Sequence, residues 1–473
     1  MSELQSAHPG PSPIAKWKAG RWAIPLVAIV ILLSFRILTL TIPDRIGAYQ
    51  SHAYAPNGPW IMQDFRDTVW LPIHYLWYGG NPYETSAYLR WAPANASGFF
   101  LYTPAIMTLM MPLAALKWSV AASAWTIFDL LIAFWIAWYS VQLANLPKRV
   151  DAACAIAALL LLWLPTQLAF QTGNPSMLVI GAAVFVLGRR RNDWLTAVGL
   201  AVCMLKVQFG VPMIVLLLAI RLWRPVLRAV GIVVLLSLPT TVLAVRNAGS
   251  VSAFWHSLVT NLDAQRASAY GNLTTPGAYR WDLAGIIGRL TGINLRMDVQ
   301  ILLVSVILII GSWNFGRAVS SRHEDLTFAI GSLTVMLCLF HNRYDFVICF
   351  PAAIMLAQGS IRDIASTVAS RVARGVIAAL ILGVGYHPYH IDQVLSISPD
   401  FAQDLNGIAI LTALLACVVL LLRSLETDRL QVGRSHHYQP GHRRDKSLAS
   451  SASESWAAAA LRVSRRLHSA PED

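Results

Sequence analysis

Long apolar runs recur along most of the chain and are separated by short polar stretches. About 20 consecutive apolar residues are what an α-helix needs to cross the ~30 Å hydrocarbon core of a bilayer. The pattern therefore predicts an all-α polytopic membrane protein with about twelve transmembrane helices. The predicted spans are 22–42, 99–116, 119–144, 150–169, 175–188, 194–220, 225–245, 299–319, 325–340, 344–358, 375–387 and 407–423.

The first apolar run is a retained span rather than a signal peptide, because it is too long and no small-residue cleavage pattern follows it. Lys16, Lys18 and Arg21 precede it, so the N-terminus is expected in the cytoplasm. Three parts are expected along the chain: a cytoplasmic arm (1–21), a transmembrane domain (22–423) and a basic, disordered cytoplasmic tail (424–473).

Composition and charge agree with a membrane protein. The chain is 56% hydrophobic and 13% charged, and its net charge is +13. The excess of Lys and Arg lies in the arm, the short loops and the tail, which fits the positive-inside rule and anionic lipid better than nucleic acid. Lys148-Arg149 and Arg189-Arg190-Arg191 fall on the outer side of a twelve-span topology. Either they are exceptions, or some segments between 99 and 220 are half-spans or re-entrant.

Two long segments of the transmembrane domain, 44–98 and 246–298, are expected on the extracytoplasmic side. The first contains two carboxylates, Asp64 and Asp67, flanked by aromatic residues. Carboxylates are costly next to lipid, so these two side chains must face water or be held against other protein segments. A site at the membrane surface is one interpretation.

The second outer segment mixes arginines with aromatic residues, including Arg266, Tyr270 and Arg280. Sugars have apolar faces and hydroxylated edges, and such side chains can contact both. An amphipathic loop that lies on lipid headgroups is an equally good interpretation.

Lys206 interrupts the apolar run AVGLAVCMLKVQFGVPMIVLLL. A lysine within a span costs a few kcal/mol, so it is expected to be paired with an anion or to face a polar cavity. Asp129 is the obvious candidate for a buried ion pair. Asn174, in FQTGNPSMLV, is either a loop cap or part of the wall of a polar pocket.

The short segment HNRYD places His341, Arg343 and Asp345 together between two predicted spans. These residues are either polar caps of helix ends or part of a substrate-binding site. No dense cluster of acidic or His residues is present, so a metal-free site is favoured, although a divalent metal is not excluded.

In order and spacing, several motifs of the chain resemble family 87 of the GT-C superfamily of membrane glycosyltransferases. That family contains mannosyl- and arabinofuranosyltransferases that depend on polyprenyl phosphate. The motifs are QDF (63–65), GGNPY (79–83), FLYTPAIMTLMMPLAAL (100–116), FQTGNPSMLV (170–179) and MLK (204–206) ahead of RLWRPVLR (221–228).

The resemblance implies a GT-C-type bundle in the plasma membrane that uses a polyprenyl-phosphate sugar, with mannose slightly favoured over arabinofuranose. The acceptor is a glycolipid or polysaccharide of the cell envelope. A catalytic carboxylate of the first outer segment corresponds to Asp64. Asp67 has no counterpart in the family pattern and is either a second acid of the site or a structural acid. Lys206, Arg266 or Arg280 would bind the donor phosphate. The alternatives are a flippase or transporter of lipid-linked sugars and a non-catalytic envelope scaffold.

Overall fold

The computed structural model describes residues 23–41, 62–93, 96–99, 102–146, 150–267, 273, 280–362, 367–384 and 399–437. The regular elements among them are all helices, and an isolated bridge joins Tyr102 to Lys206. The all-α class predicted from the sequence is therefore confirmed. The chain divides into two units, 1–421 and 422–473, and the first contains the site described below.

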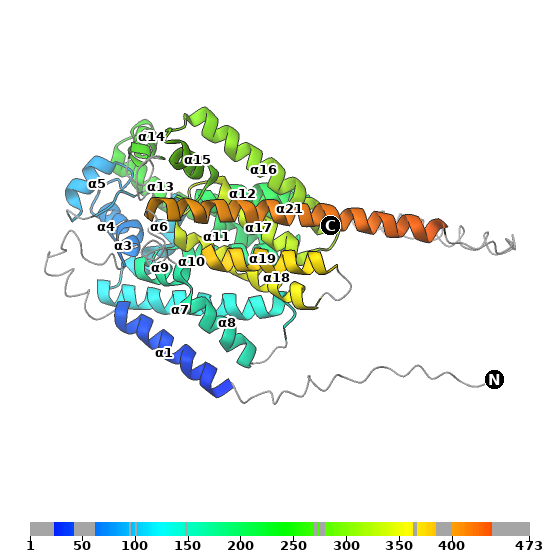
Figure 1. Ribbon diagram of the computed structural model, residues 1–473. Helices are drawn as coiled ribbons and strands as arrows, with labels where there is room; N and C mark the ends of the chain where they lie inside the picture. The colour runs from blue at the N-terminus through cyan, green and yellow to red at the C-terminus, as the bar shows by residue number, and fades with distance from the viewer. Residues whose placement is uncertain are drawn as a thin grey trace, which may run out of the picture. The chain divides into compact units, whose positions relative to one another are not determined.

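Four short helices lie in the first outer segment, 44–98. They are α3 (Gln63–Phe65), η2 (Arg66–Trp70), α4 (Leu71–Trp77) and α5 (Thr85–Trp91). The second outer segment is helical as well and contains α14 (Val251–Ala267) and α15 (Leu283–Thr291). Figure 1 shows α3, α4, α5 and α14 gathered at one end of the first unit.

The other helices of the chain account for the apolar runs. They are α1 (Ala23–Thr41), α6 (Pro104–Ala114), α7 (Trp118–Leu143), α8 (Val150–Leu162), α9 (Leu164–Thr172), α10 (Ser176–Arg189), α11 (Trp194–Cys203), α12 (Val207–Ala219), α13 (Trp223–Ala248), α16 (Met297–Ser320), α17 (Glu324–Cys338), η3 (Arg343–Cys349), α18 (Phe350–Arg362), α19 (Val368–Val384) and α21 (Pro399–His437).

Fewer helices are long enough to cross a membrane than the twelve expected. Five described helices pass by length and composition, and the pair α8 and α9, bent by 66°, raises the number to six. The predicted span 194–220 is divided into α11 and α12, which meet at Lys206. The predicted span 99–116 contains only α6, whose 11 residues measure about 17 Å. Hydropathy alone does not reveal such breaks.

α6 starts and ends at the same end of the bundle. Before its first turn, the Thr103 backbone N–H donates to the carbonyl of Leu205, next to Lys206. At its C-terminal end, the carbonyl of Ala114 lies 2.9 Å from His74 Nε2, on the segment that also carries Asp64. The segment 99–116 is therefore not a crossing, and α7 starts at the end of the bundle where α3 and α4 lie.

The basic loops gather at the opposite end. Gly188, in the last turn of α10, lies against Tyr139 near the C-terminal end of α7. Arg190 forms an ion pair with Glu324, and the adjacent Asp325 forms another with Arg374 at 2.9 Å. The loop after α10, which carries Arg189-Arg190-Arg191, therefore lies with the other basic loops, whereas Lys148-Arg149 lie outside the described residues. The two exceptions to the charge rule disappear once 99–116 is not counted as a span.

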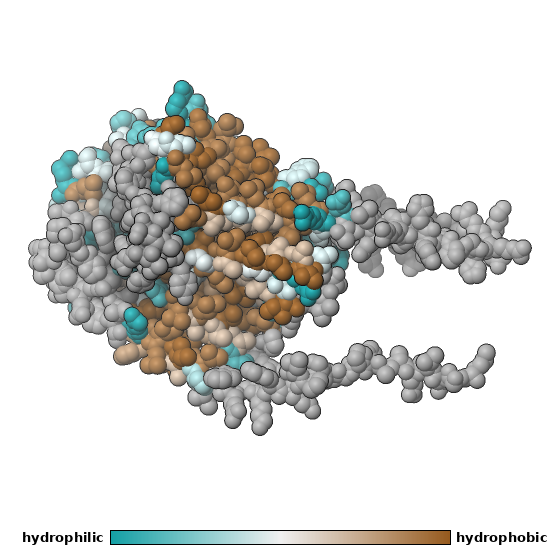
Figure 2. Space-filling model, viewed as in Figure 1, coloured by the Kyte–Doolittle hydropathy of each residue, from teal (hydrophilic) through white to brown (hydrophobic). Residues whose placement is uncertain are grey.

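The surface of the helices is apolar where a bilayer would surround them. Figure 2 shows brown side chains over the middle of the face in view and teal side chains toward its ends. Leu235 and Val242 of α13 and Ile309 and Trp313 of α16 are among the large exposed apolar residues. In contrast, every residue of α17 from Leu326 to Cys338 is buried, which is typical of a central helix.

Candidate functional site

Asp64 lies at the edge of a buried polar network. It follows Met62, whose φ of 54° starts the short helix α3, and it is half-buried. Its Oδ2 accepts a hydrogen bond of 2.8 Å from Asn174 Nδ2. Burial raises the pKa of the Asp64 carboxyl above its ordinary value, while the hydrogen bond from Asn174 and the charge of Lys206 act in the opposite direction.

The turn between α9 and α10 fixes the approach of Asp64 to Asn174. Gly173 ends α9 with a φ of 63°, a conformation that favours glycine. A Cβ at this position would lie 2.7 Å from Met62 Sδ, so a side chain here would push α3 away. The Met62 backbone N–H also donates to the carbonyl of Gln171 over 2.8 Å. The sequence TGNPS therefore holds the start of α3 against the turn.

Lys206 lies where α11 and α12 meet, and it is only 3% exposed. Its ammonium is 3.4 Å from Asp345 Oδ1, 2.5 Å from Ser176 Oγ and 3.2 Å from Asn174 Oδ1. The rings of Tyr102, Phe209 and Tyr344 surround it at 5.5, 5.9 and 5.6 Å. The lysine that interrupts an apolar run is thus paired with an acid, hydrogen-bonded and enclosed by aromatic rings.

The ion pair expected between Lys206 and Asp129 is wrong. Asp129 is buried in α7, and among the described residues its carboxylate oxygens have no hydrogen-bond partner. Lys206 is paired instead with Asp345, which lies in another part of the chain. Hydropathy identified two charged residues in apolar runs but could not show which charges meet.

Asp345 is a polar cap, one of the two roles that the sequence left open for HNRYD, and it is also part of the network around Lys206. Its Oδ2 accepts from the Asn342 backbone N–H at 3.0 Å, which caps η3, and lies 3.2 Å from His341 Nδ1. Its Oδ1 accepts from Ser176 Oγ at 2.6 Å and faces Lys206. One carboxylate therefore caps a helix and balances the buried ammonium.

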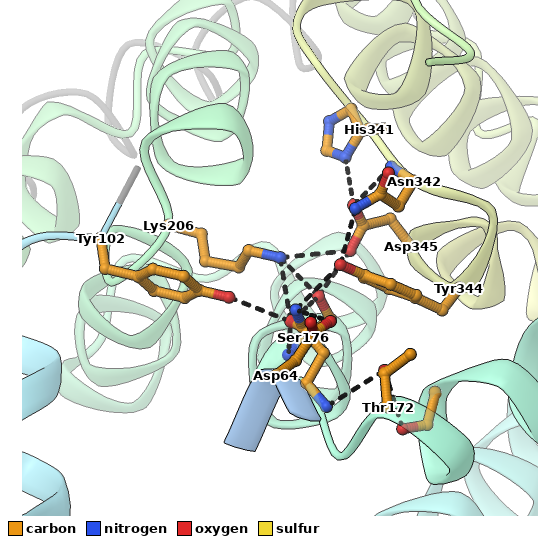
Figure 3. A network of polar contacts seen from close by, with 11 residues as sticks. Asp64, Tyr102, Thr172, Ser176, Lys206, His341, Asn342, Tyr344 and Asp345 are labelled. Carbon is orange, nitrogen blue, oxygen red and sulfur yellow. Dashed lines mark hydrogen bonds and ion pairs between the residues drawn. The ribbon is translucent and has the colours of Figure 1, made fainter. Parts of the chain in front are cut away.

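Three residues of the network, Tyr102, Tyr344 and Asn342, were not predicted individually. Tyr102 Oη donates to Asn174 Oδ1 over 3.1 Å. Tyr344 Oη accepts from Asn174 Nδ2 at 2.8 Å and from Asn342 Nδ2 at 2.6 Å. Figure 3 shows the labelled side chains converging from several helices. The sequence feature that could have identified these three residues is their position inside the motifs FLYTP and HNRYD.

Asp67 belongs to a different set of contacts. It is fully buried, with Arg66 Nε 2.6 Å from its Oδ1. Its Oδ2 accepts from the backbone N–H and the hydroxyl of Ser97 at 2.8 and 2.9 Å. These contacts hold the first outer segment together, so the geometry gives Asp67 a structural role and leaves Asp64 as the accessible acid.

The other predicted residues lie around the network or outside the described part. Arg280 is paired with Asp282 at 2.6 Å, and the next residue, Trp281, donates its backbone N–H to the carbonyl of His341. Arg343 is buried in η3. Tyr270 and the side chain of Arg266 lie outside the described residues. The structure thus joins Asp64, Asn174, Lys206, His341 and Asp345 in one network.

No group of three His, Cys, Asp or Glu side chains is arranged to hold a metal ion in the part of the chain that the structure describes. The oxygen-rich set that a divalent cation requires would have to be built around Asp64. Its hydrogen-bond partner there is an amide that donates, and its charged neighbours are the carboxylate of Asp67 and the ammonium of Lys206. A donating amide and an ammonium supply no ligands for a cation, and metal independence stays a prediction.

Comparison with known proteins supports the resemblance seen in the sequence. The model of glycosyltransferase family 87 matches residues 100–340, about half of the chain, including Tyr102, Asn174 and Lys206. Asp64 and Asp345 lie beyond the two ends of the match. No curated protein and no solved structure matches the chain. The chain is a helical membrane protein that belongs to glycosyltransferase family 87.

Proposed function

We propose that the chain transfers one sugar from a polyprenyl-phosphate donor to a glycolipid or polysaccharide of the cell envelope. The observation that carries this proposal is the position of Asp64. It is a half-buried carboxylate at the edge of a network whose other charged members, Lys206 and Asp345, are buried. In the proposed reaction the acceptor hydroxyl would therefore approach the network at Asp64. Mannose is the proposed sugar because of the family resemblance, and arabinofuranose is the alternative.

In the proposed reaction Asp64 is the general base. The acceptor hydroxyl attacks the anomeric carbon and gives its proton to the Asp64 carboxylate, while the bond between that carbon and the phosphate oxygen breaks. The lipid phosphate leaves with the bonding electrons, and the anomeric configuration is inverted. Because burial raises the pKa of Asp64, this carboxylate is a stronger base than an aspartate in water.

The departing phosphate needs a fixed positive charge nearby. Lys206 is the described cation nearest to Asp64 within the network, since both contact the amide of Asn174. Its charge is already balanced by Asp345, and its N–H groups face Asp345, Ser176 and Asn174, so it would act by exchanging one of these hydrogen bonds for one to the phosphate. Arg280 and Arg266 stay as alternative phosphate-binding residues.

The proposed side of transfer is extracytoplasmic, and the protein is proposed to be a multi-pass plasma membrane enzyme. The network lies at the end of the bundle where α3 and α4 are found, and the basic loops with Arg190 and Arg374 lie at the other end. Basic loops remain in the cytoplasm as a rule. Asp64 would then face the outer leaflet, where an isoprenoid-borne sugar meets its acceptor.

The test is transfer by the purified full chain in lipid nanodiscs. Each synthetic polyprenyl-phosphate sugar is offered with a crude envelope glycolipid and polysaccharide fraction, and the product is identified by mass spectrometry and NMR. We expect transfer from the mannose donor with inversion, and no transfer by Asp64→Asn. Folded wild-type protein that is inactive with every donor would favour transport or scaffolding instead.

A parallel arm tests metal independence. We expect the transfer rate to be unchanged after treatment with a strong chelator, because the proposed reaction uses only Asp64 and a fixed cation. A loss of activity that Mg²⁺ or Mn²⁺ restores would contradict a metal-free site.

A further inference from the structure

Asn174 connects the accessible acid of the site to the buried ion pair. Its Nδ2 donates to Asp64 Oδ2 and to Tyr344 Oη, both over 2.8 Å. Its Oδ1 lies 3.2 Å from the ammonium of Lys206, which is paired with Asp345. The two ends of one amide thus face groups of opposite charge.

The surroundings of Asn174 determine which way its amide points. Oδ1 accepts from Tyr102 Oη at 3.1 Å and from the Ser176 backbone N–H at 2.9 Å, and it faces Lys206. A flipped amide would place its NH₂ group against these donors and against an ammonium, which is unfavourable. The orientation of Nδ2 toward Asp64 is therefore set by the protein and does not depend on Asp64 itself.

The backbone fixes the amide as well. Asn174 is 3% exposed and stands between Gly173, which ends α9, and Pro175, which precedes the first residue of α10. The contact from the Ser176 backbone N–H to Oδ1 is an Asx-type turn, the local structure that an asparagine at this position favours. The side chain is thus held before any substrate binds.

We propose that Asn174 is the positioning residue of the site: its fixed amide aims the Asp64 carboxylate at the acceptor hydroxyl and, by donating to Oδ2, stabilises the charged form that accepts the proton. This assignment rests on the role of Asp64 as the base in the proposed function. Of the two interpretations that the sequence left open for Asn174, a loop cap and part of the wall of a substrate-binding polar pocket, it favours a wall residue that acts through Asp64.

The charged and titratable groups that face Asp64 support this role. Burial and the charge of Asp67 raise the pKa of the Asp64 carboxyl, and Lys206 and Tyr344 lower it. Tyr102 is the other phenol near Asp64. Burial raises its pKa well above the ordinary value, so it stays neutral and exerts no charge on Asp64. The hydrogen bond from Asn174 is the largest effect that opposes burial. Its loss would therefore leave Asp64 protonated to a higher pH.

The test measures protonation of Asp64 without using a substrate. The full chain in nanodiscs is labelled at a series of pH values with a carbodiimide, which reacts with protonated carboxyls. Labelling of Asp64 is quantified by peptide mass spectrometry, and the midpoint is the pH at which half of Asp64 is labelled. For Asn174→Ala we expect the midpoint to lie about one pH unit higher than in the wild type. Thr172→Ala is the matched control, because it removes a hydrogen bond to the Asn174 backbone N–H in the same turn without touching Asp64.

Asn174→Asp is a second variant that tests the same contact if Asn174→Ala does not fold. It keeps an oxygen for Lys206 and replaces the donor to Asp64 by a second carboxyl, so we expect the midpoint to rise at least as far as in Asn174→Ala. Folding of both variants is checked by size-exclusion chromatography and by thermal unfolding. If both folded variants label at the same midpoint pH as the wild type, the proposal is overturned.

Transfer kinetics add a second readout. In Asn174→Ala we expect kcat to fall about tenfold or more, the acidic limb of the kcat/KM profile to move to higher pH, and the donor KM to change by less than about twofold. A shifted labelling midpoint in a chain that transfers no sugar would keep the contact and reject the proposed reaction. If the wild type and Asn174→Ala both transfer sugar and their labelling midpoints are equal, the role of Asn174 is rejected and the proposed function stands.

Discussion

The ammonium of Lys206 lies 3.4 Å from the carboxylate of Asp345, although 139 positions separate the two residues along the chain. Both side chains are buried, at 3% and 0% exposure. Removing one partner of such a pair leaves an uncompensated buried charge, whereas removing both leaves none. The pair therefore connects the α11–α12 junction to the start of η3. Comparing the single variants with the double variant separates its contribution to stability from any role of Lys206 in donor binding.

We predict that Lys206→Met and Asp345→Asn each lower the free energy of unfolding by about 3 kcal/mol. The double variant should recover most of that loss, because neither charge remains unpaired. The measurement is denaturant unfolding of the four proteins in the same detergent, analysed as a double-mutant cycle. Additive losses in the double variant would show that the two side chains do not stabilise each other.

The same double variant tests the role of Lys206 in donor binding. If Lys206 contacts the donor phosphate, the folded double variant should show a donor KM raised by about tenfold or more, because a hydrogen bond to a charged group is lost. The acceptor KM serves as the internal control. A donor KM equal to that of the wild type would leave Lys206 with a purely structural role.

The two acids of the first outer segment should respond differently to the same substitution. Asp64→Asn is expected to lower kcat by about 100-fold or more, the contribution of a general base, with membrane levels unchanged. Asp67→Asn removes the buried partner of Arg66, so it should lower thermal stability while folded protein keeps its kcat within about threefold. The readouts are transfer rate per folded protein and thermal unfolding. An active, normally expressed Asp64→Asn variant would remove Asp64 as the base.

The raised pKa of Asp64 predicts opposite effects on activity and stability. Since the folded protein binds the Asp64 proton more tightly than the unfolded chain does, the contribution of this group to stability is present at low pH. It is lost as the pH rises from the ordinary aspartate pKa through the raised one. Activity follows the reverse course, because the base must be ionised. Asp64→Asn should therefore unfold at a higher temperature than the wild type at neutral pH, and the difference should vanish in acid.

The residues that the sequence identified best are polar residues in apolar surroundings. Lys206 in an apolar run and Asp64 after the first span are costly next to lipid, so each required a partner or water. The turn residue Asn174 and the HNRYD segment were noted for the same reason. The structure joins residues from all four positions through hydrogen bonds and one ion pair. The physics of burial therefore indicated which side chains mattered.

The partners could not be predicted, because they depend on contacts between distant parts of the chain. Asp129 and Asp345 are both acids near apolar runs, and no local pattern favours one over the other as the partner of Lys206. Tyr102 and Tyr344 look like ordinary aromatic residues of helix ends. Hydropathy also cannot show that α6 returns to the end of the bundle where it started. That single fact changes the side assigned to every loop between 117 and 193.

The position of α6 gives a topology that cysteine labelling can test. Asn192 is exposed in the basic loop between α10 and α11, and Tyr78 is 76% exposed after α4. A topology with twelve spans puts both outside, whereas the structure puts them at opposite ends. We predict that Tyr78→Cys reacts with a membrane-impermeant maleimide in intact cells and that Asn192→Cys reacts only after permeabilisation. Four native cysteines are buried and Cys154 is half-buried, so the parent chain is labelled alongside to give the background.

Each outcome of that labelling bears on the site. Modification of Asn192→Cys in intact cells would restore 99–116 as a crossing and contradict the arrangement of α6 against Lys206. Protection of Tyr78→Cys until permeabilisation would place the segment of Asp64 in the cytosol. Because η2 alone separates the helix of Asp64 from α4, and His74 of α4 contacts the end of α6, the acid cannot face the outer leaflet if Tyr78 faces the cytosol. An extracytoplasmic transferase would then be excluded whatever the chemistry of Asp64.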